Sequence, residues 1–345
     1  GVCPKPGEER RIRIRVERQI ETLFLPMEEE PHLVRFDPGA FVLADVTYKF
    51  GARLAAAALQ HDSDCVARIR AARELAKDGS RSARDALERA LAEESFWGVA
   101  AEIADALGGT RAPWALELLT KHAAHSHPKV RRAVAAALGH FRNAEAAEAL
   151  LPRARDDASY FVRASALHAL GRTRDPRAFD VLSDGIATHS WNGVIESGAA
   201  RGLGELADER ATPLLLEAAK LGHEESLRRA AIDGLARLAA LVESQRRTIV
   251  DALGGYLDDP MFLVQLSAVA AAERLEDIRL VEPLTRLGES AFDGRVRRNA
   301  ADAAIRIREG QRVPSQVSAL RSELDTLREE YRKLEGKLDE ISTHR

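Results

Sequence analysis

The stretch ASYFVRASALHALGRTRDPRAFDVL, residues 158–182, decides the fold because it contains one complete unit of a repeated pattern. Val162, Ala166 and Leu170 are four residues apart, which places them on one face of a helix. Gly171 follows, where a left-handed helix cap is expected, and the Asp-Pro pair after it suits the start of a second helix. The unit therefore predicts two helices joined by a tight turn. Two such helices cannot enclose an apolar core, so copies must stack against them.

The same three-residue frame occurs eight times along the chain. The frames are Ala67/Ala71/Leu75, Val99/Ile103/Leu107, Val130/Val134/Leu138, Val162/Ala166/Leu170, Ile195/Ala199/Leu203, Leu227/Ala231/Leu235, Val264/Ala268/Ala272 and Val296/Ala300/Ala304. Their last members are 31 to 33 residues apart, except for one step of 37. Gly108, Gly139, Gly171 and Gly204 each follow a frame and are predicted to be helix caps. The pattern predicts a mainly helical chain, an α-solenoid of the HEAT type with about eight helix pairs.

Residues 1–50 predict antiparallel β-strands in place of helices. Apolar and polar residues alternate in residues 10–19, 19–27, 32–37 and 40–50, which indicates three or four strands. So few strands have little core of their own, so we interpret them as the end of a larger β-sandwich. A small capping sheet is the alternative. The chain begins with Gly, which suggests that it is a fragment.

Residues 51–310 hold the predicted solenoid, and residues 311–345 form a linker and a coiled-coil-like helix. Apolar residues alternate there in steps of three and four, as in a heptad repeat. The predicted seam is Val317, Leu320, Leu324, Leu327, Tyr331, Leu334, Leu338 and Ile341. This seam must be buried, either against a partner helix, as in a homodimer, or against upstream parts of the same chain.

Composition excludes several classes of partner. The chain has 51 Lys and Arg against 54 Asp and Glu, a net charge of −3, so neither nucleic acid nor an anionic membrane is expected as a partner. Cys3 and Cys65 form no disulfide framework and no metal-binding spacing. No apolar run is long enough to cross a membrane. The location stays open, with the cytoplasm as the default.

No catalytic residue, cofactor site or metal ligand is predicted. A His-Glu pair at residues 223–224 begins the zinc motif His-Glu-x-x-His, but position 227 is Leu. His122, His125 and His127 lie close in sequence, without a carboxylate or Cys at a fitting interval. We interpret these histidines as polar surface, and metal binding is the alternative.

An arginine follows the first frame position in five of the eight units: Arg68, Arg131, Arg163, Arg228 and Arg297. We interpret them as a structural ladder, in which each guanidinium bonds a turn carboxylate or carbonyl of a neighbouring repeat. Arg163 would then pair with Asp156 or Asp157. The alternative is a basic stripe that binds acidic peptide ends or a partner.

The three tryptophans, Trp97, Trp114 and Trp191, occur in helical contexts. Core or inter-repeat packing is the favoured interpretation, and ligand platforms are the alternative.

Six segments follow one another in a characteristic order. They are PHLVRFDPGAFVLADVTYKF, HDSDCVARIRAARELAKDG, ESFWGVAAEIADALG, HPKVRRAVAAALG, SYFVRASALHALG and SWNGVIESGAARGLG. Together they resemble the C-terminal region of bacterial M1-family zinc metallopeptidases, the aminopeptidase N-like group. The resemblance runs from about residue 8 to the heptad tail, and its specific part is VRFDPG followed directly by the repeats.

The resemblance implies that residues 10–50 end a β-sandwich and that residues 52–308 form a helical cap over an active site. The family's motifs His-Glu-x-x-His and Gly-x-Met-Glu-Asn are absent here. Zinc and catalysis would therefore belong to upstream domains of the same polypeptide, with a peptide as substrate. The alternative is a stand-alone HEAT scaffold that binds proteins and dimerises through its tail. A HEAT-type bilin lyase is a weaker idea, because it explains neither the strands nor the heptads.

Overall fold

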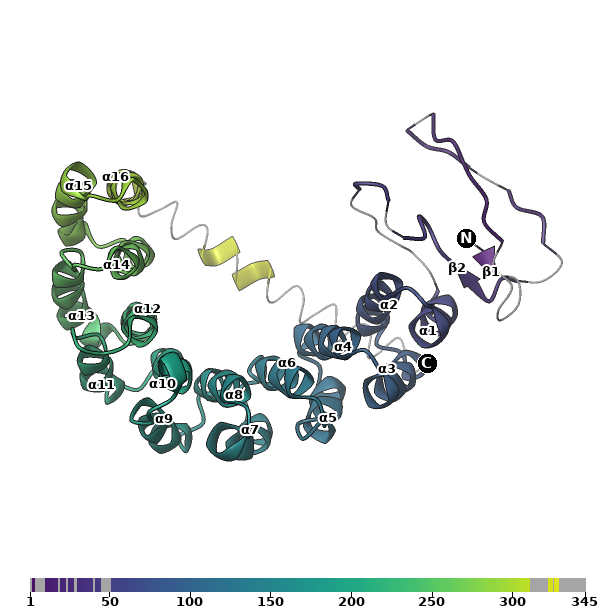
Figure 1. Ribbon diagram of the computed structural model, residues 1–345, viewed down its shortest axis with the longest axis horizontal. Coiled ribbons are helices and arrows are strands. Elements are labelled where there is room, and N and C mark those ends of the chain that lie inside the picture. Colours follow the sequence, from purple (N-terminus) through teal and green to yellow (C-terminus); the bar gives the residue numbers. More distant parts are fainter. Residues whose placement is uncertain are drawn as a thin grey trace. The chain divides into compact units, whose positions relative to one another are not determined.

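Helices dominate the computed structural model (Figure 1). It describes residues 2–3, 10–17, 19–22, 24–27, 30–39, 41–44, 51–310, 322–324 and 326–328. The chain divides into two units, residues 1–234 and residues 235–345, and each is described by itself. None of the helices in the described residues has the length and apolar character to span a membrane.

The first unit is built of helix pairs joined by short turns. Its helices are α1 (Ala52–His61), α2 (Cys65–Asp78), α3 (Arg81–Glu93), α4 (Trp97–Thr110), α5 (Pro113–Lys121), α6 (Pro128–Leu138), α7 (Ala144–Asp156), α8 (Tyr160–Thr173), α9 (Ala178–Ile186), α10 (Val194–Leu206), α11 (Ala211–Ala218) and α12 (Glu225–Leu241). A 3₁₀ turn, η1 (Trp191–Gly193), leads into α10. The boundary between the two units falls within α12.

These helices form two rows, which Figure 1 shows as two lines of ribbons. The even-numbered helices α2, α4, α6, α8 and α10 pack on one another in order, and the odd-numbered helices α1, α3, α5, α7 and α9 form the second row. Each frame of the sequence lies on an even-numbered helix, and its residues are buried, apart from the half-buried Ala67. The predicted helical solenoid is confirmed.

The second unit repeats the same arrangement. Its helices are α13 (Glu243–Tyr256), α14 (Phe262–Leu275), α15 (Val281–Ser290) and α16 (Gly294–Gly310), with the 3₁₀ turn η2 (Ile278–Leu280) before α15. Helix α16 packs on both α14 and α15. The last two frames lie buried on α14 and α16.

The prediction that four glycines are helix caps is confirmed for Gly139 and wrong for the other three. Three of them lie inside α4, α8 and α10, and Gly139 ends α6 with a φ of −64°. The left-handed residues come three positions after the glycine, at Arg111, Arg174 and Ala207, with φ of 54°, 56° and 61°. These helices therefore continue for almost one turn beyond the predicted end.

The glycines are required by close packing between neighbouring even-numbered helices. A Cβ atom on Gly171 would collide with the carbonyl oxygen of Gly202 on α10. A Cβ on Gly204 would lie 2.5 Å from the Cα of Gly234 on α12. Backbone meets backbone at both positions, so no side chain could move aside to make room.

The N-terminal region has less strand structure than predicted. Strand β2 (Leu33–Val34) pairs antiparallel with β1 (Val2–Cys3), with Val34 opposite Val2. In residues 10–17, 19–22, 24–27 and 41–44, the structure has an isolated bridge at Arg10 and no further strand. Apolar side chains of the predicted strands are exposed there, for example Phe24 at 89% and Leu43 at 105%. The strands do not form because no second layer in the described residues covers their apolar face.

The predicted heptad helix falls mostly outside the described residues. Residues 322–324 and 326–328 are helical, and two seam residues, Leu324 and Leu327, are 48% and 60% exposed. The other seam positions, Val317, Leu320, Tyr331, Leu334, Leu338 and Ile341, are not among the described residues.

The close helix packing predicts the effect of one added methyl group. Gly171→Ala should lower the free energy of unfolding by about 2 kcal/mol or more, because the backbone of α10 would have to move. Gly109→Ala on α4 is the matched control, since nothing lies within 4 Å of a Cβ there. That substitution should leave stability unchanged or raise it by up to about 1 kcal/mol. Urea unfolding followed by circular dichroism measures both, and equal midpoints would contradict the packing argument.

Candidate functional site

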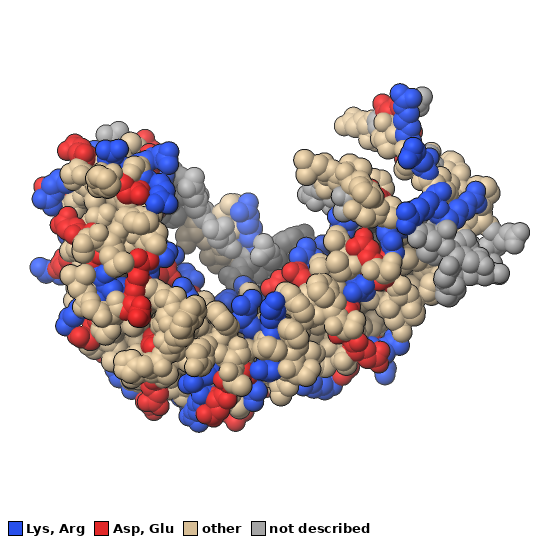
Figure 2. Space-filling view, viewed as in Figure 1, with Lys and Arg blue, Asp and Glu red and all other residues tan. Residues whose placement is uncertain are grey.

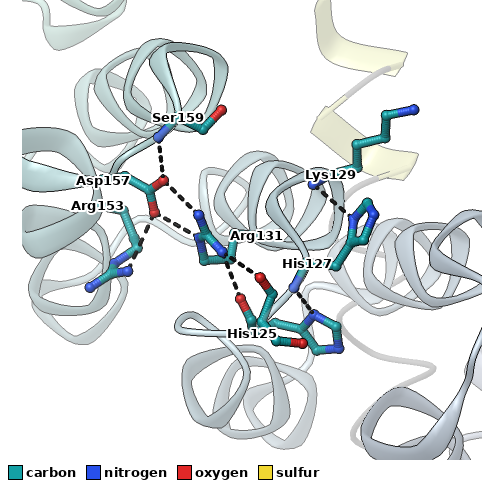
Figure 3. Close-up of polar contacts among 8 residues, drawn as sticks. His125, His127, Lys129, Arg131, Arg153, Asp157 and Ser159 are labelled. Carbon is teal, nitrogen blue, oxygen red and sulfur yellow. Dashed lines mark hydrogen bonds and ion pairs between the residues drawn. The ribbon is translucent and has the colours of Figure 1, made fainter.

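A buried carboxylate holds the turn between α7 and α8. Asp157 Oδ1 accepts the backbone N–H of Ser159, the residue that precedes α8, at 3.0 Å. Arg131, from the first turn of α6, donates from Nε to Oδ2 at 2.8 Å and from Nη2 to Oδ1 at 2.9 Å. Arg153 adds a third guanidinium contact at 3.3 Å, and the Asp157 side chain is only 1% exposed (Figure 3).

Arg131 also binds the turn that precedes its own helix. Its Nη1 donates to the carbonyl oxygens of His125 and Ser126, both at 2.9 Å. One guanidinium therefore joins two consecutive turns, as Figure 3 shows. Such a bidentate, charge-assisted contact fixes orientation as well as distance.

These contacts shift the pKa of both partners. Burial raises the pKa of the Asp157 carboxyl, but hydrogen bonds from Arg131 and from the Ser159 amide outweigh it, so the pKa lies below its usual value. The hydrogen bond to Asp157 likewise raises the pKa of Arg131. Both groups are therefore charged near neutral pH.

The turn between α3 and α4 repeats the arrangement. Arg68 on α2 donates from Nε and Nη2 to the carboxylate of Glu94, at 2.9 and 3.2 Å, and from Nη1 to the carbonyl of Asp62 at 2.8 Å. Glu94 in turn accepts the backbone N–H of Phe96 at 2.9 Å. Glu94 lies two residues before Phe96, which directly precedes α4. Asp157 has the same position relative to Ser159, which directly precedes α8.

The other three arginines of the predicted ladder lie differently. Arg163 donates from Nε to the carbonyl of Ala154 at 3.4 Å, where a contact to Asp156 or Asp157 was expected. Asp157 is engaged by Arg131 and Arg153 instead. Arg228 is buried and donates to the carbonyl of Ala219 at 3.1 Å, and Arg297 is exposed on α16.

A second kind of arginine–carboxylate pair was not predicted from the sequence. In Asp-x-Arg segments at turns, the aspartate accepts both the backbone N–H and the guanidinium of the arginine two residues later. The pairs are Asp175/Arg177, Asp208/Arg210, Asp277/Arg279 and Asp293/Arg295. The recurring Asp-x-Arg spacing is the signal that could have found them.

Large aromatic side chains stand at the edge where the even-numbered helices begin. We call this edge the aromatic rim, and its members are Phe96, Trp97, His127, Tyr160, Phe161 and Trp191. They lie in the turns and first helical residues of α4, α6, α8 and α10, which are neighbours in one row. Trp191 is 71% exposed and Phe161 is 54% exposed. The packing interpretation is therefore wrong for Trp191.

The three histidines near the rim take different positions. His125 Nδ1 accepts the N–H of His127 at 3.1 Å, and His127 Nδ1 accepts the N–H of Lys129 at 3.2 Å. The His127 ring stacks on Trp97, with centroids 5.9 Å apart and planes at 6°, and Lys129 Nζ lies 3.8 Å from the Trp97 centroid. Burial lowers the pKa of both His122 and His125. Nowhere in the described residues do three or more His, Cys, Asp or Glu side chains form a group suited to a metal ion.

A separate groove of about 890 Å³ lies over α2 and α4. Arg73, Lys77, Asp105 and Trp114 are among its lining residues. Arg73 is paired with Glu102 at 2.6 Å and Lys77 with Glu74 at 2.8 Å, so these two cations are already neutralised. Trp114 is half-buried beneath Arg84, whose guanidinium carbon lies 4.9 Å from the ring centroid.

The buried pair predicts a large effect when one partner is removed. Arg131→Met should lower the free energy of unfolding by about 3 kcal/mol, because it takes the principal cation from the buried Asp157 carboxylate. Arg210→Met removes an exposed arginine from an Asp-x-Arg pair and should change stability little. Urea unfolding compares the two variants. Equal losses would show that the Asp157 site is not the stronger contact.

Acid should remove the contribution of the Asp157 carboxylate. Because its folded pKa is depressed, the stabilisation is present above the unfolded value, about pH 4, and is lost as the pH falls through the folded pKa. Asp157→Asn should therefore be less stable than the parent at pH 6, and the difference should shrink by pH 3. Urea midpoints at both values test this, and a constant difference would contradict it.

Comparison with known proteins bears on the fold. A model of HEAT repeats matches residues 52–127, 119–197 and 162–236. A search of curated proteins found no match. Among solved structures, human deoxyhypusine hydroxylase in complex with glycerol is 21% identical, over 65% of this chain and 96% of that one, with a TM-score of 0.30.

Two further structures are similar. The complex of CpcE and CpcF of phycocyanin lyase from Nostoc sp. PCC7120 is 29% identical, over 46% of this chain and 97% of that one, with a TM-score of 0.38. YibA of E. coli is 18% identical, over 72% and 90%, with a TM-score of 0.42. The matched repeats span residues 52–236, more than half of the 345 residues. The chain belongs to the HEAT-repeat family.

Proposed function

We propose that the chain is the non-catalytic C-terminal part of an M1-like zinc aminopeptidase, in which the solenoid covers the active site and restricts the peptides that reach it. The observation that carries the proposal is the attachment of the segment around β2 to the first repeat. This segment contains VRFDPG, the most specific part of the resemblance to that family.

Arg35 makes that attachment. Its Nε donates to Asp62 Oδ2 at 2.9 Å, and its Nη2 also bonds Asp62. Asp62 accepts the backbone N–H of Asp64, the residue before α2, at 2.8 Å. The geometry matches the Arg131–Asp157 contact, so the N-terminal segment takes the place that a preceding repeat would occupy. A domain continuing from β2 would therefore be held in a fixed position on α1 and α2.

The exposed apolar side chains of this region support a covering domain. Ile20, Phe24, Phe41 and Leu43 are all exposed, and they belong to segments whose alternation predicts strands. Exposed apolar groups in such number are typical of a surface that another protein layer covers. In the proposal, that layer is the β-sandwich of the parent peptidase.

In the proposal, zinc is bound outside these repeats. The described residues hold no suitable cluster of His, Cys, Asp or Glu, and the sequence lacks His-Glu-x-x-His. Zinc and the reacting groups would therefore be supplied by upstream domains. The solenoid would contribute shape and polar contacts to the peptide, which needs no reaction centre in these repeats.

A stand-alone scaffold is the second candidate. Its support is the aromatic rim together with the exposed seam residues Leu324 and Leu327, which suit a protein partner and a second copy of the chain. In that case the N-terminal segment would act as a terminal cap for the repeats.

One experiment separates the two functions. We expect the gene upstream of Gly1 to contain an open reading frame that encodes His-Glu-x-x-His. We also expect the present chain alone, supplied with zinc, to show no turnover of aminoacyl-arylamides, and the chain with its upstream domains to be active. A start codon directly before Gly1 would favour the scaffold. Zinc-dependent turnover by the chain alone would contradict both candidates.

A further inference from the structure

We propose that the chain's own C-terminal segment, residues 317–341, packs as an antiparallel helix on the exposed face of α16 and closes the end of the repeats. The proposal joins two exposed apolar surfaces of the second unit, one on α16 and one on the predicted heptad seam. It goes beyond the proposed function and does not depend on whether the chain is part of a peptidase.

The first step is the face that an even-numbered helix turns toward the next one. Two positions on this face come five and nine residues after the first frame residue, and in α8 they are Leu167 and Gly171. A Cβ on Gly202 of α10 would lie 2.5 Å from the Leu167 carbonyl oxygen, and a Cβ on Gly171 would collide with Gly202. An added Cβ would likewise meet the next even-numbered helix at the equivalent glycines of α4, α6 and α10, which are Gly108, Gly139 and Gly204.

The second step is that α16 has the same face uncovered. The residue five positions after the first frame residue is buried in all seven earlier even-numbered helices, at Ala72, Ala104, Ala135, Leu167, Ala200, Ile232 and Val269. The equivalent residue of α16, Ala301, is exposed, and Ile305, four residues later, is 51% exposed. Figure 1 shows α16 at the end of its row, and no even-numbered helix follows it within residues 51–310. In the described residues, α16 therefore presents a packing face without the neighbour that the other repeats have.

The third step is the sequence that follows α16. Residues 311–316 separate this helix from the predicted seam, which begins at Val317. Connections of about two to eight residues join antiparallel helices, and six extended residues span about 20 Å, more than the roughly 8–10 Å between packed helices. The linker is therefore long enough for the seam to return along α16 as its next neighbour.

The two surfaces have matching spacing. The exposed strip of α16 advances in steps of four and three residues, at Gly294, Arg298, Ala301, Ile305 and Arg308. The seam also advances in steps of three and four, and its two described residues, Leu324 and Leu327, are helical and exposed. Such steps keep side chains on one face of a helix, so the strip and the seam can pack along several turns.

The chain covers the other end of its repeats in a comparable way. Strand β2 lies outside the repeats and packs on α1, and its Leu33 is buried. A terminal helix of a solenoid needs such a cover, because its packing face would otherwise meet solvent. A second cover, at α16, follows the same requirement.

Charge favours the seam over a second copy of α16 as the occupant. Helix α16 has five arginines against Asp302 and Glu309, and two of the five are paired with carboxylates outside the helix, so one positive charge remains in excess. Residues 317–341 have seven acidic and five basic residues, a net charge of −2. Figure 2 shows basic side chains over the end formed by α15 and α16. Opposite signs attract across this contact, whereas two copies of α16 would bring like charges together.

Hydrogen–deuterium exchange of the full chain tests the contact, and sedimentation records its oligomeric state. We expect a monomer in which the amides of residues 317–341 exchange at least about tenfold more slowly than unstructured amides. Ile305→Glu on α16 and Leu324→Glu in the seam should each remove most of this protection, because each puts a charge into the apolar contact.

Ile278→Glu is the matched control. Ile278 is 56% exposed, close to the value for Ile305, but it lies in η2, outside the strip. This variant should leave the exchange of residues 317–341 unchanged. Circular dichroism checks that every variant is folded, which the exposure of both isoleucines favours.

A disulfide then locates the helix. With Cys3 and Cys65 replaced by Ser, the double variant Ile305→Cys, Leu324→Cys should form a cross-link within one chain on oxidation, because an antiparallel return brings these positions together. The double variant Ile278→Cys, Leu324→Cys should form much less of it.

Several results would overturn the proposal. They are unprotected amides in residues 317–341 of the parent chain, protection that Ile305→Glu leaves unchanged, or equal cross-linking from Ile278→Cys. A dimer whose protection falls on dilution, or a cross-link that joins two chains only, would assign the seam to a second copy instead. Aminopeptidase activity does not enter these measurements, so the outcome is separate from that of the proposed function.

Discussion

The structure depends on one constraint: a pair of short amphipathic helices cannot bury its own apolar stripe. Each even-numbered helix of the first unit therefore packs on the next one, and Val99, Val130 and Val162 are removed from solvent by neighbours some thirty residues away. Glycine makes the contact closer still between α8 and α10, where the backbone of Gly202 occupies the space of a missing side chain on Gly171. Apolar burial drives the stacking, and small residues set its distance.

Charged groups at the turns give this stacking its orientation. Arg131 binds the carbonyls of its own turn and the carboxylate of the next one, and Arg68 does the same two pairs of helices earlier. Apolar packing is non-directional, whereas a bidentate guanidinium contact has a defined geometry. The arginines therefore hold the turns of successive repeats in register, and the residues displayed on those turns come into line.

The aromatic rim follows from that alignment. Phe96 and Ser159 each have a backbone N–H bound to the carboxylate that an arginine of the preceding repeat also holds. The same contact that stabilises the turn places the next residues, Trp97 and Tyr160, at the outer edge of the row. A contact that stabilises the turn thus also fixes where these aromatic side chains lie.

Much of the fold could be predicted from the sequence, because the repeat is translational. The spacing of Val162, Ala166 and Leu170 depends only on helix geometry, and its recurrence implies stacking whatever the details of packing. Strand formation in residues 10–27 could not be predicted in the same way, since strands need a partner layer that local alternation does not supply.

The candidate site was only partly predictable. The periodic arginines were visible in the sequence, but the partner of each was not: Asp157 pairs with Arg131 of the preceding repeat and not with Arg163. Gly171 was predicted to be a helix cap because the local sequence does not show that the backbone of another helix, some thirty residues away, packs against it. By itself the sequence determined the repeated helix pair, because helical periodicity is local. Only the tertiary structure decided which glycines meet, which charges pair and which aromatic rings stay exposed, because these depend on contacts between repeats.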